Sequence, residues 1–104
     1  MFERRHQPRV PAVMSVEIRD GDDFAIFASS DVSVGGLFFD RAIPHAVGAR
    51  VHLRFTLPGE RELIECDGEV ANVPDPTGYG MGIRFIDVRP DDVARLQVFI
   101  TTVG

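Results

Sequence analysis

Two short polar patterns near the start of this chain consist of side chains that can bind anions and nucleobases. The first is Arg5–Arg9 (RHQPR), where two arginines stand four residues apart and Arg4 directly precedes them. The second is Asp31–Gly36 (DVSVGG), which has the spacing Asp-x-Ser-x-x-Gly. Taken singly, each also fits an ordinary structure: a solubilising tail for the arginines and an Asx-turn for the acidic pattern.

Together these residue types match the chemistry of a guanine nucleotide. An arginine fork binds phosphate oxygens, and also the O6/N7 edge of guanine, through two parallel hydrogen bonds. The carboxylate of Asp31 can accept hydrogen bonds from N1–H and N2–H₂ of guanine, a donor pair that adenine lacks. Ser33 can donate to a phosphate or hold the loop, while Gly35 and Gly36 allow positive φ and close approach of a flat ring. We therefore expect these residues and the arginines to form one ligand site.

The charge distribution favours a small anionic ligand over a nucleic acid. The chain of 104 residues has a net charge of −5, and all eleven of its basic residues are arginine. Residues 1–9 hold three arginines against one glutamate, a charge of +2, so the remainder carries −7. Binding of DNA or RNA requires many phosphate contacts from a basic face. We expect neither as a partner.

Other function classes lack the residues they need. The three histidines, His6, His45 and His52, have no metal-like spacing, and Cys66 is the single cysteine, so we expect no metal site and no cofactor. No base is placed to activate Ser33 as a nucleophile, which argues against an enzyme. No apolar run approaches the roughly 20 residues that span a bilayer, and the N-terminus does not resemble a secretory signal. A cytoplasmic domain without membrane insertion is the expectation.

The pattern of apolar residues predicts a small β-domain that positions these motifs. Residues 1–10 are polar and Arg-rich and contain Pro8, which favours an extended arm. Short runs of β-type pattern follow over residues 14–19, 24–32, 37–39, 50–57, 62–73 and 81–86. The last segment, 90–103, begins with proline and two aspartates and then repeats apolar residues at helical spacing. The prediction is a β-barrel over residues 11–88 and a helix over 90–103.

Some strands carry more specific expectations. The run 24–32 is apolar enough to suggest little exposure to solvent, and Gly68 inside the run 62–73 suggests a bulge or bend. Cys66 alternates with apolar residues, which predicts a core position.

Two neighbouring strands carry opposite charges on their polar faces. Those side chains are Arg50, His52 and Arg54 on one strand and Glu65, Asp67 and Glu69 on the next. Two interpretations stay open for them: cross-strand ion pairs and a protein-docking surface.

With both motifs in this order on a β-patterned chain, the sequence resembles the PilZ domain family. The resemblance covers the arm at Arg5–Arg9, the motif at Asp31–Gly36, the strand 80–85 (GMGIRF) and the helix after it. It implies a six-stranded antiparallel PilZ-type β-barrel with a C-terminal α-helix that binds cyclic di-GMP through the two motifs. It also implies that Arg4, directly before the arm motif, accompanies binding of an intercalated ligand dimer.

The resemblance implies a receptor that changes the conformation of its arm on ligand binding and signals through an unidentified effector protein. The site residues would be Arg4, Arg5, Arg9, Asp31, Ser33, Gly35 and Gly36. Two alternatives stay open. One is a PilZ-fold adaptor that acts through protein contacts without nucleotide, and the other is a receptor for a related cyclic dinucleotide that contains guanine.

Overall fold

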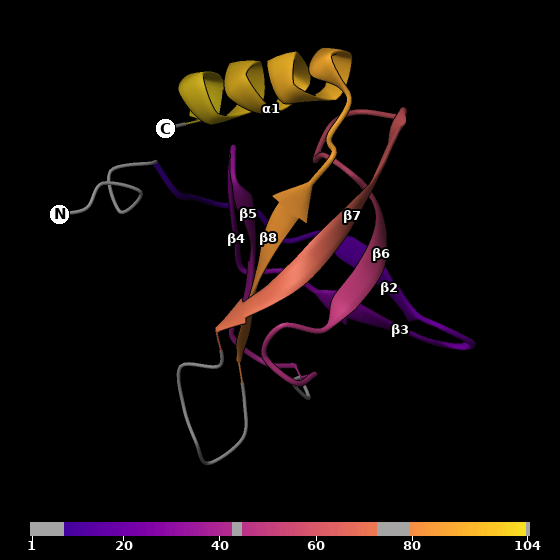
Figure 1. Cartoon of the computed structure of the whole chain (residues 1–104). Helices are drawn as coiled ribbons and strands as arrows, with labels where there is room; N and C mark the ends of the chain where they lie inside the picture. Colours follow the sequence, from indigo (N-terminus) through magenta and orange to yellow (C-terminus); the bar gives the residue numbers. More distant parts are fainter. Residues whose placement is uncertain (1–7, 43–44, 73–79, 104) are drawn as a thin grey trace, which may run out of the picture.

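A computed structural model describes residues 8–42, 45–72 and 80–103 of the chain. They form one antiparallel sheet of eight strands and a single helix that lies across one end of the curled sheet (Figure 1). The elements are β1 (Val10–Pro11), β2 (Ser15–Asp20), β3 (Asp23–Ala28), β4 (Asp31–Ser33), β5 (Gly36–Phe39), β6 (Arg50–Thr56), β7 (Leu63–Asn72), β8 (Met81–Ile86) and α1 (Pro90–Val103). The predicted mainly β, barrel-type fold with a C-terminal helix is confirmed.

One bent ribbon curls the sheet. The strand order is β1-β4-β5-β8-β7-β6-β2-β3, so β1 with β4 stands at one end and β2 with β3 at the other. Both pairs belong to the same two-stranded ribbon of residues 10–33, in which the register shifts by one residue across the bend. Because this ribbon pairs with β5 at one end and with β6 at the other, the rest of the sheet is forced to curl.

The bend in the ribbon is held by a buried serine. Ser29 Oγ donates a hydrogen bond of 2.6 Å to the carbonyl of Ala12 and accepts one of 3.2 Å from the backbone N–H of Met14. Its own N–H donates to the carbonyl of Met14, and the N–H of Ala12 donates to Ser30. The backbone groups at the bend therefore find partners although the ladder is interrupted, as buried polar groups require.

The alternation seen in the sequence sorts each strand into a core face and an outer face. Along β6, Val51, Leu53 and Phe55 are buried, while Arg50 and Arg54 at alternate positions are exposed. The helix covers the core with Leu96 and Ile100, both buried. Cys66 lies in the same core, as predicted, and burial raises the pKa of its thiol to about 12. At neutral pH the group is therefore a protonated thiol and does not react as a nucleophile.

The strand count and the run 24–32 differ from the expectation. Eight strands occur among the described residues in place of six, because Val10–Pro11 pairs with β4 and because the run 24–32 breaks at Ser29 and Ser30. The run is also not shielded from solvent: the side chains of Phe24 and Ile26 on β3 are 56% and 61% exposed. The strand is apolar on both faces, but the molecule covers only one of them.

Gly68 does not mark a bulge. It pairs in regular register with Val51 and Phe85, and the register shift of β7 lies further on, between Val70 and Asn72. A Cβ at position 68 would press on the side chains of Ile83 and Leu53. The prediction of a bulge at Gly68 was therefore wrong, and glycine is needed there for core space.

Within the described residues, no helix is both long and apolar enough to cross a membrane.

Candidate ligand-binding site

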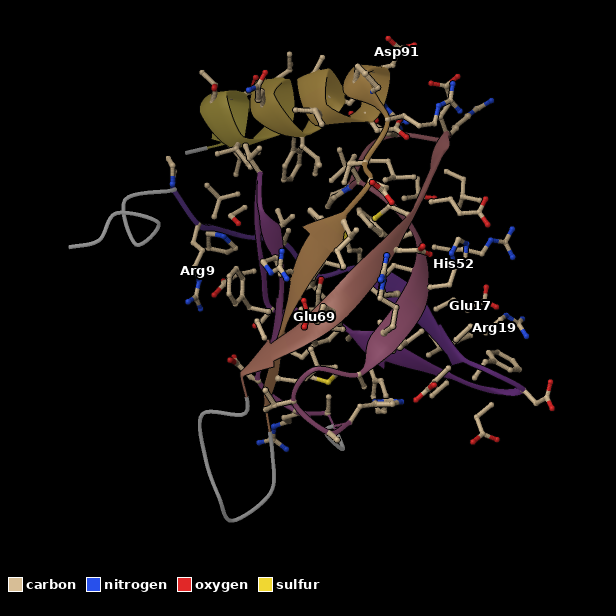
Figure 2. The ribbon with its side chains drawn as sticks, viewed as in Figure 1. Arg9, Glu17, Arg19, His52, Glu69 and Asp91 are labelled. Atoms are coloured by element: carbon tan, nitrogen blue, oxygen red, sulfur yellow. The ribbon has the colours of Figure 1, made fainter. Side chains whose placement is uncertain are left out.

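Arg9 of the first motif and Asp31 of the second meet on the outer face of the sheet. Arg9 directly precedes β1, where Pro11 pairs with Asp31 of β4. Since side chains alternate along a strand, Arg9 points to the same face as Pro11 and reaches Asp31 diagonally. Its Nη2 donates a hydrogen bond of 2.8 Å to Oδ2 of Asp31. Arg9 is labelled at the left of Figure 2. The structure thus brings together residues that are 22 positions apart.

An aromatic ring completes this contact. Phe38 of β5 is the direct cross-strand neighbour of Asp31, and the guanidinium carbon of Arg9 lies 3.9 Å from the centre of its ring. The guanidinium of Arg9 is therefore held by a carboxylate at one edge and an aromatic face beneath it. Sequence reasoning missed Phe38. Its signal was the strand Gly36–Phe39 (GLFF), in which Leu37 and Phe39 face the core and the residue between them must face outward.

Ser33 supports the loop and does not face the solvent. The residue is buried, and its Oγ accepts hydrogen bonds of 3.1 Å from the backbone N–H groups of both Gly35 and Gly36. Of the two roles expected for this hydroxyl, the geometry favours holding the turn between β4 and β5. The carbonyl of Gly35 in turn accepts from the N–H of Phe85, which ties the turn to β8.

Position 36 requires glycine because β8 passes close to it. A Cβ on Gly36 would overlap the backbone carbonyl oxygen of Ile83. Any side chain here would have to push two paired strands apart. The glycine of the motif thus permits the close spacing of β8 and β5, the strand that carries Phe38.

Three further arginines bear on the predicted site. Arg4 and Arg5 lie outside the described residues. Next to Gly36 on β8 stands Arg84, which is exposed and ion-paired with Glu69 of β7. This second guanidinium lies on the outer face beside the motif, and the sequence analysis assigned it no role in binding.

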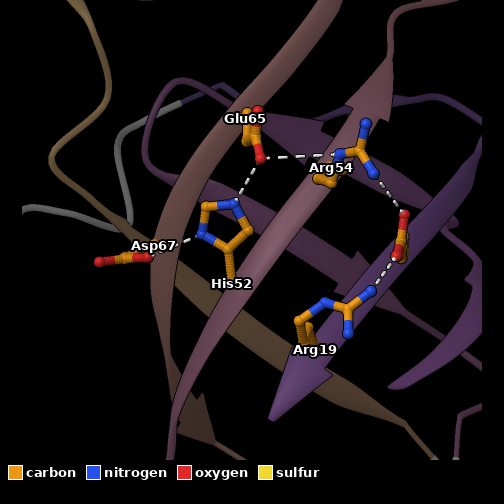
Figure 3. A network of polar contacts seen from close by, with 6 residues as sticks. Arg19, His52, Arg54, Glu65 and Asp67 are labelled. Atoms are coloured by element: carbon orange, nitrogen blue, oxygen red, sulfur yellow. Dashed lines mark hydrogen bonds and ion pairs between the residues drawn. The ribbon is translucent and has the colours of Figure 1, made fainter. Parts of the chain in front are cut away.

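The charged ladder on β6 and β7 is a network of internal ion pairs (Figure 3). Nδ1 of His52 lies 2.9 Å from Asp67 and Nε2 lies 2.7 Å from Glu65. Arg54 contacts both Glu65 and Glu17. The hydrogen bonds to Asp67 and Glu65 raise the pKa of His52 above its usual value, and His52 lowers the pKa of Glu65. Of the two interpretations left open, cross-strand pairing describes His52 and Arg54 with their acidic partners, while Glu69 pairs with Arg84 of β8.

The part of the chain that the structure describes contains no cluster of His, Cys, Asp and Glu side chains suited to a metal ion.

A comparison with protein families finds one that matches nearly the whole chain. The PilZ domain profile matches residues 3–102 of the 104. The chain belongs to the PilZ domain family. This is a family of non-catalytic domains, in agreement with the expectation that the chain is not an enzyme. A comparison with curated protein sequences finds no match.

Solved structures resemble this PilZ domain throughout its length. The inhibitor of motility MotI/DgrA of Bacillus subtilis is 22% identical with a TM-score of 0.79, and 97% of this chain aligns with 51% of that one. YcgR of Escherichia coli in complex with c-di-GMP is 20% identical with a TM-score of 0.78, over 96% of this chain and 46% of that one. The PilZ domain of YcgR with c-di-GMP is 20% identical with a TM-score of 0.70, over 97% and 92%.

This chain therefore spans about half the length of MotI/DgrA and of YcgR, and nearly all of the isolated YcgR PilZ domain. At these identities the likeness concerns the fold.

Proposed function

We propose that this PilZ domain is a receptor for cyclic di-GMP. The observation that carries the proposal is the contact of Arg9 with Asp31 and Phe38, which joins the arm motif to the Asp-x-Ser-x-x-Gly motif on one outward face. The similarity to two structures of YcgR that contain c-di-GMP supports the same ligand.

In this proposal, Arg9 holds the place that a guanine takes in the complex. Guanine resembles the guanidinium in two respects: it presents N–H donors at one edge to the carboxylate of Asp31, and it offers a flat face to the ring of Phe38. The side chain of Arg9 is 52% exposed and that of Asp31 27% exposed. An exposed ion pair contributes only about 0–1 kcal/mol, so an incoming base can replace it at little cost.

The displaced arginine then becomes a phosphate ligand. Its fork matches the phosphate oxygens of the cyclic dinucleotide, and Arg5 provides a second fork from the same arm. Binding of the phosphates by Arg5 and Arg9 changes the conformation of the arm over the site. A partner protein would read this change of conformation.

Asp31 determines the preference for guanine. Its carboxylate accepts from the N1–H and N2–H₂ edge of guanine, and adenine presents no such pair of donors. Related cyclic dinucleotides with one guanine would satisfy one half of this recognition. We expect them to bind more weakly than cyclic di-GMP, and cyclic di-AMP to bind least.

Calorimetric titration with cyclic di-GMP tests the proposal. Arg5→Ala, Arg9→Ala and Asp31→Ala should each weaken binding by at least about 2 kcal/mol, because each removes one partner of a charge-assisted hydrogen bond. Arg61→Ala is the matched control, since Arg61 is an exposed arginine in the turn between β6 and β7. Absence of binding by the wild type at micromolar ligand would favour an adaptor that works without nucleotide. Loss of ligand over time would indicate an enzyme.

Arg4 concerns the stoichiometry of binding. An extra guanidinium before the arm motif can stack on or bond to a second ligand molecule, so we propose two ligands per domain. The titration should then give two ligands for the wild type and one for Arg4→Ala. A wild-type stoichiometry of one, with unchanged affinity in Arg4→Ala, would exclude the dimer.

A further inference from the structure

Among the described residues, no strand lies beside the outer edge of β3. β3 is the last strand of the sheet order, and within that part of the chain it pairs with β2 alone. The N–H of Ser29 donates a hydrogen bond to the carbonyl of Met14, so Met14 and Ser29 form a hydrogen-bonded pair of the ladder. Such pairs alternate with non-bonded ones along an antiparallel ladder. It follows that the backbone N–H and C=O groups of Phe24, Ile26 and Ala28 point away from β2.

The same three residues present an apolar surface. Phe24 and Ile26 are more than half exposed, and Ala28 between Ile26 and the bend is exposed as well. No charged residue and no proline stands between Phe24 and Ala28. Natural proteins usually protect an open edge with a charge, a proline or a bulge, because such an edge pairs with other strands. From Phe24 to Ala28 this edge carries none of these, which is typical of a surface that pairs with another strand.

We infer that β3 pairs with β3 of a second copy of this chain, antiparallel and around a two-fold axis through Ile26. In this register Ile26 lies opposite Ile26 of the other copy, and Phe24 lies opposite Ala28. All three rungs then use the free backbone groups, and the large phenylalanine meets the small alanine. On the inner face Phe27 lies opposite Ala25, which again pairs a large side chain with a small one.

Charge is compatible with this register. The acidic tip of the β2–β3 hairpin, Asp22 and Asp23, lies opposite Ser30 and Ser29 of the other copy, so no two acids of the ribbon face each other. The net charge of −5 on each copy opposes association as a whole. Salt screens this repulsion, so the dimer should become tighter as the salt concentration rises. Docking through opposite charges would weaken instead.

The inferred dimer leaves the ligand site open. Arg9 lies on the far side of the barrel from Arg19, which flanks the outer face of Phe24 (Figure 2). Because the inference rests on β3 and not on the motifs, it stands or falls separately from the proposed ligand.

Sedimentation velocity over a range of concentrations gives the first test. The wild type should shift from monomer to dimer, and Ile26→Asp should remain monomeric, because the axis would bring two carboxylates together. Val98→Asp, an exposed apolar position on α1, is the control and should dimerise as the wild type does. A wild type that stays monomeric at every concentration, or an Ile26→Asp variant that still dimerises, would overturn the inference.

Cysteine cross-linking tests the register. Hydrogen-bonded antiparallel pairs hold their Cα atoms about 5.5 Å apart, within the range of a disulfide. Ile26→Cys should form a covalent dimer on mild oxidation, whereas Phe24→Cys should do so only when mixed with Ala28→Cys. The buried Cys66 keeps the wild type uncross-linked as a control. Efficient self-cross-linking of Phe24→Cys, with none for Ile26→Cys, would exclude this pairing.

Discussion

At the scale of single residues, Arg9 combines two contacts that a guanine base can also make. It donates to Asp31 and lies over Phe38. A site whose carboxylate and aromatic ring are already held by a guanidinium is preorganised for a flat donor. The ligand then needs to replace one side chain without rebuilding the site, which keeps the cost of binding low.

Phe38 gives a direct readout of this exchange. The chain contains no tryptophan, so Phe38→Trp introduces a single tryptophan, which can be excited selectively, at the site. Cyclic di-GMP should quench its emission, since a stacked guanine contacts the indole face. Phe38→Leu should weaken binding by about 1–3 kcal/mol, the range measured for base–aromatic stacking. Calorimetric binding by Phe38→Trp without any change of emission would show that the base does not stack there.

Gly36 and Gly68 distinguish a collision with backbone from one with side chains. Gly36→Ala should destabilise the domain by about 1–3 kcal/mol, the usual range for overpacking, because the new methyl group would meet the carbonyl of Ile83. Gly68→Ala meets the side chains of Ile83 and Leu53 first, at 2.6 and 2.9 Å, and the carbonyl of Arg84 only at 3.2 Å, so it should cost less. Urea unfolding of both variants measures the difference. A larger loss in Gly68→Ala would contradict this explanation.

At the scale of elements, β6 and β7 are joined on their outer faces by ionisable side chains. His52 bonds both Asp67 and Glu65. The pKa values of His52 and Glu65 differ between the folded and unfolded chain: that of His52 is raised by folding and that of Glu65 is lowered. The stability contributed by the pair therefore has a maximum in pH.

The direction of each pKa shift determines how the stability depends on pH. The pKa of His52 is raised above 6.5, so its contribution is complete below pH 6.5 and is lost as the pH rises through the folded value. The pKa of Glu65 is lowered below 4.5, so its contribution is complete above pH 4.5 and is lost as the pH falls through its folded value. The pair contributes most between pH 4.5 and 6.5.

His52→Gln should accordingly reduce stability most in that window and least above it. Both side chains are more than a third exposed, so solvent screening limits the effect to less than about 1 kcal/mol. Chemical unfolding from pH 4 to 9, compared between wild type and variant, measures it. Arg50→Gln on the same strand is the control and should give a difference without this pH dependence. A difference in His52→Gln that grows above neutral pH would contradict the assignment.

At the scale of the whole molecule, the bent ribbon joins the ligand site to the free edge. Residues 10–33 contribute β1 and β4 to the site and β2 and β3 to the opposite end of the sheet. Ligand binding to the native fold stabilises all of these strands together, because a small domain unfolds as one cooperative unit.

Thermal unfolding should therefore report the ligand. Ligand at 100 times its Kd adds about 2.7 kcal/mol, and each kcal/mol moves the Tm of a domain of this size by about 4–8 °C. Cyclic di-GMP should raise the Tm by roughly 10 °C or more. Asp31→Ala in the same titration should show little shift, as should wild type with cyclic di-AMP. Equal shifts from both nucleotides would contradict guanine recognition by Asp31.

Much of the fold follows from local patterns. Alternation along β6 indicated its core and outer faces, and the helical spacing after Pro90 indicated α1 with its bounds. These inferences succeed because the side-chain period of a strand or helix is a local property. The two motifs were likewise visible in order and spacing, although the role of Ser33 in holding the turn was only one of two expected.

What only the tertiary structure decided are the contacts between distant strands. The break at Ser29 and Ser30 and the open edge of β3 result from the bend in the ribbon that supplies both ends of the sheet. Local sequence carries little information on such pairing, because many registers satisfy the same alternation. The sequence by itself determined the residue types of a guanine- and phosphate-binding site. The curled sheet decided that Arg9, Asp31 and Phe38 meet, and that the apolar outer face of β3 is left uncovered.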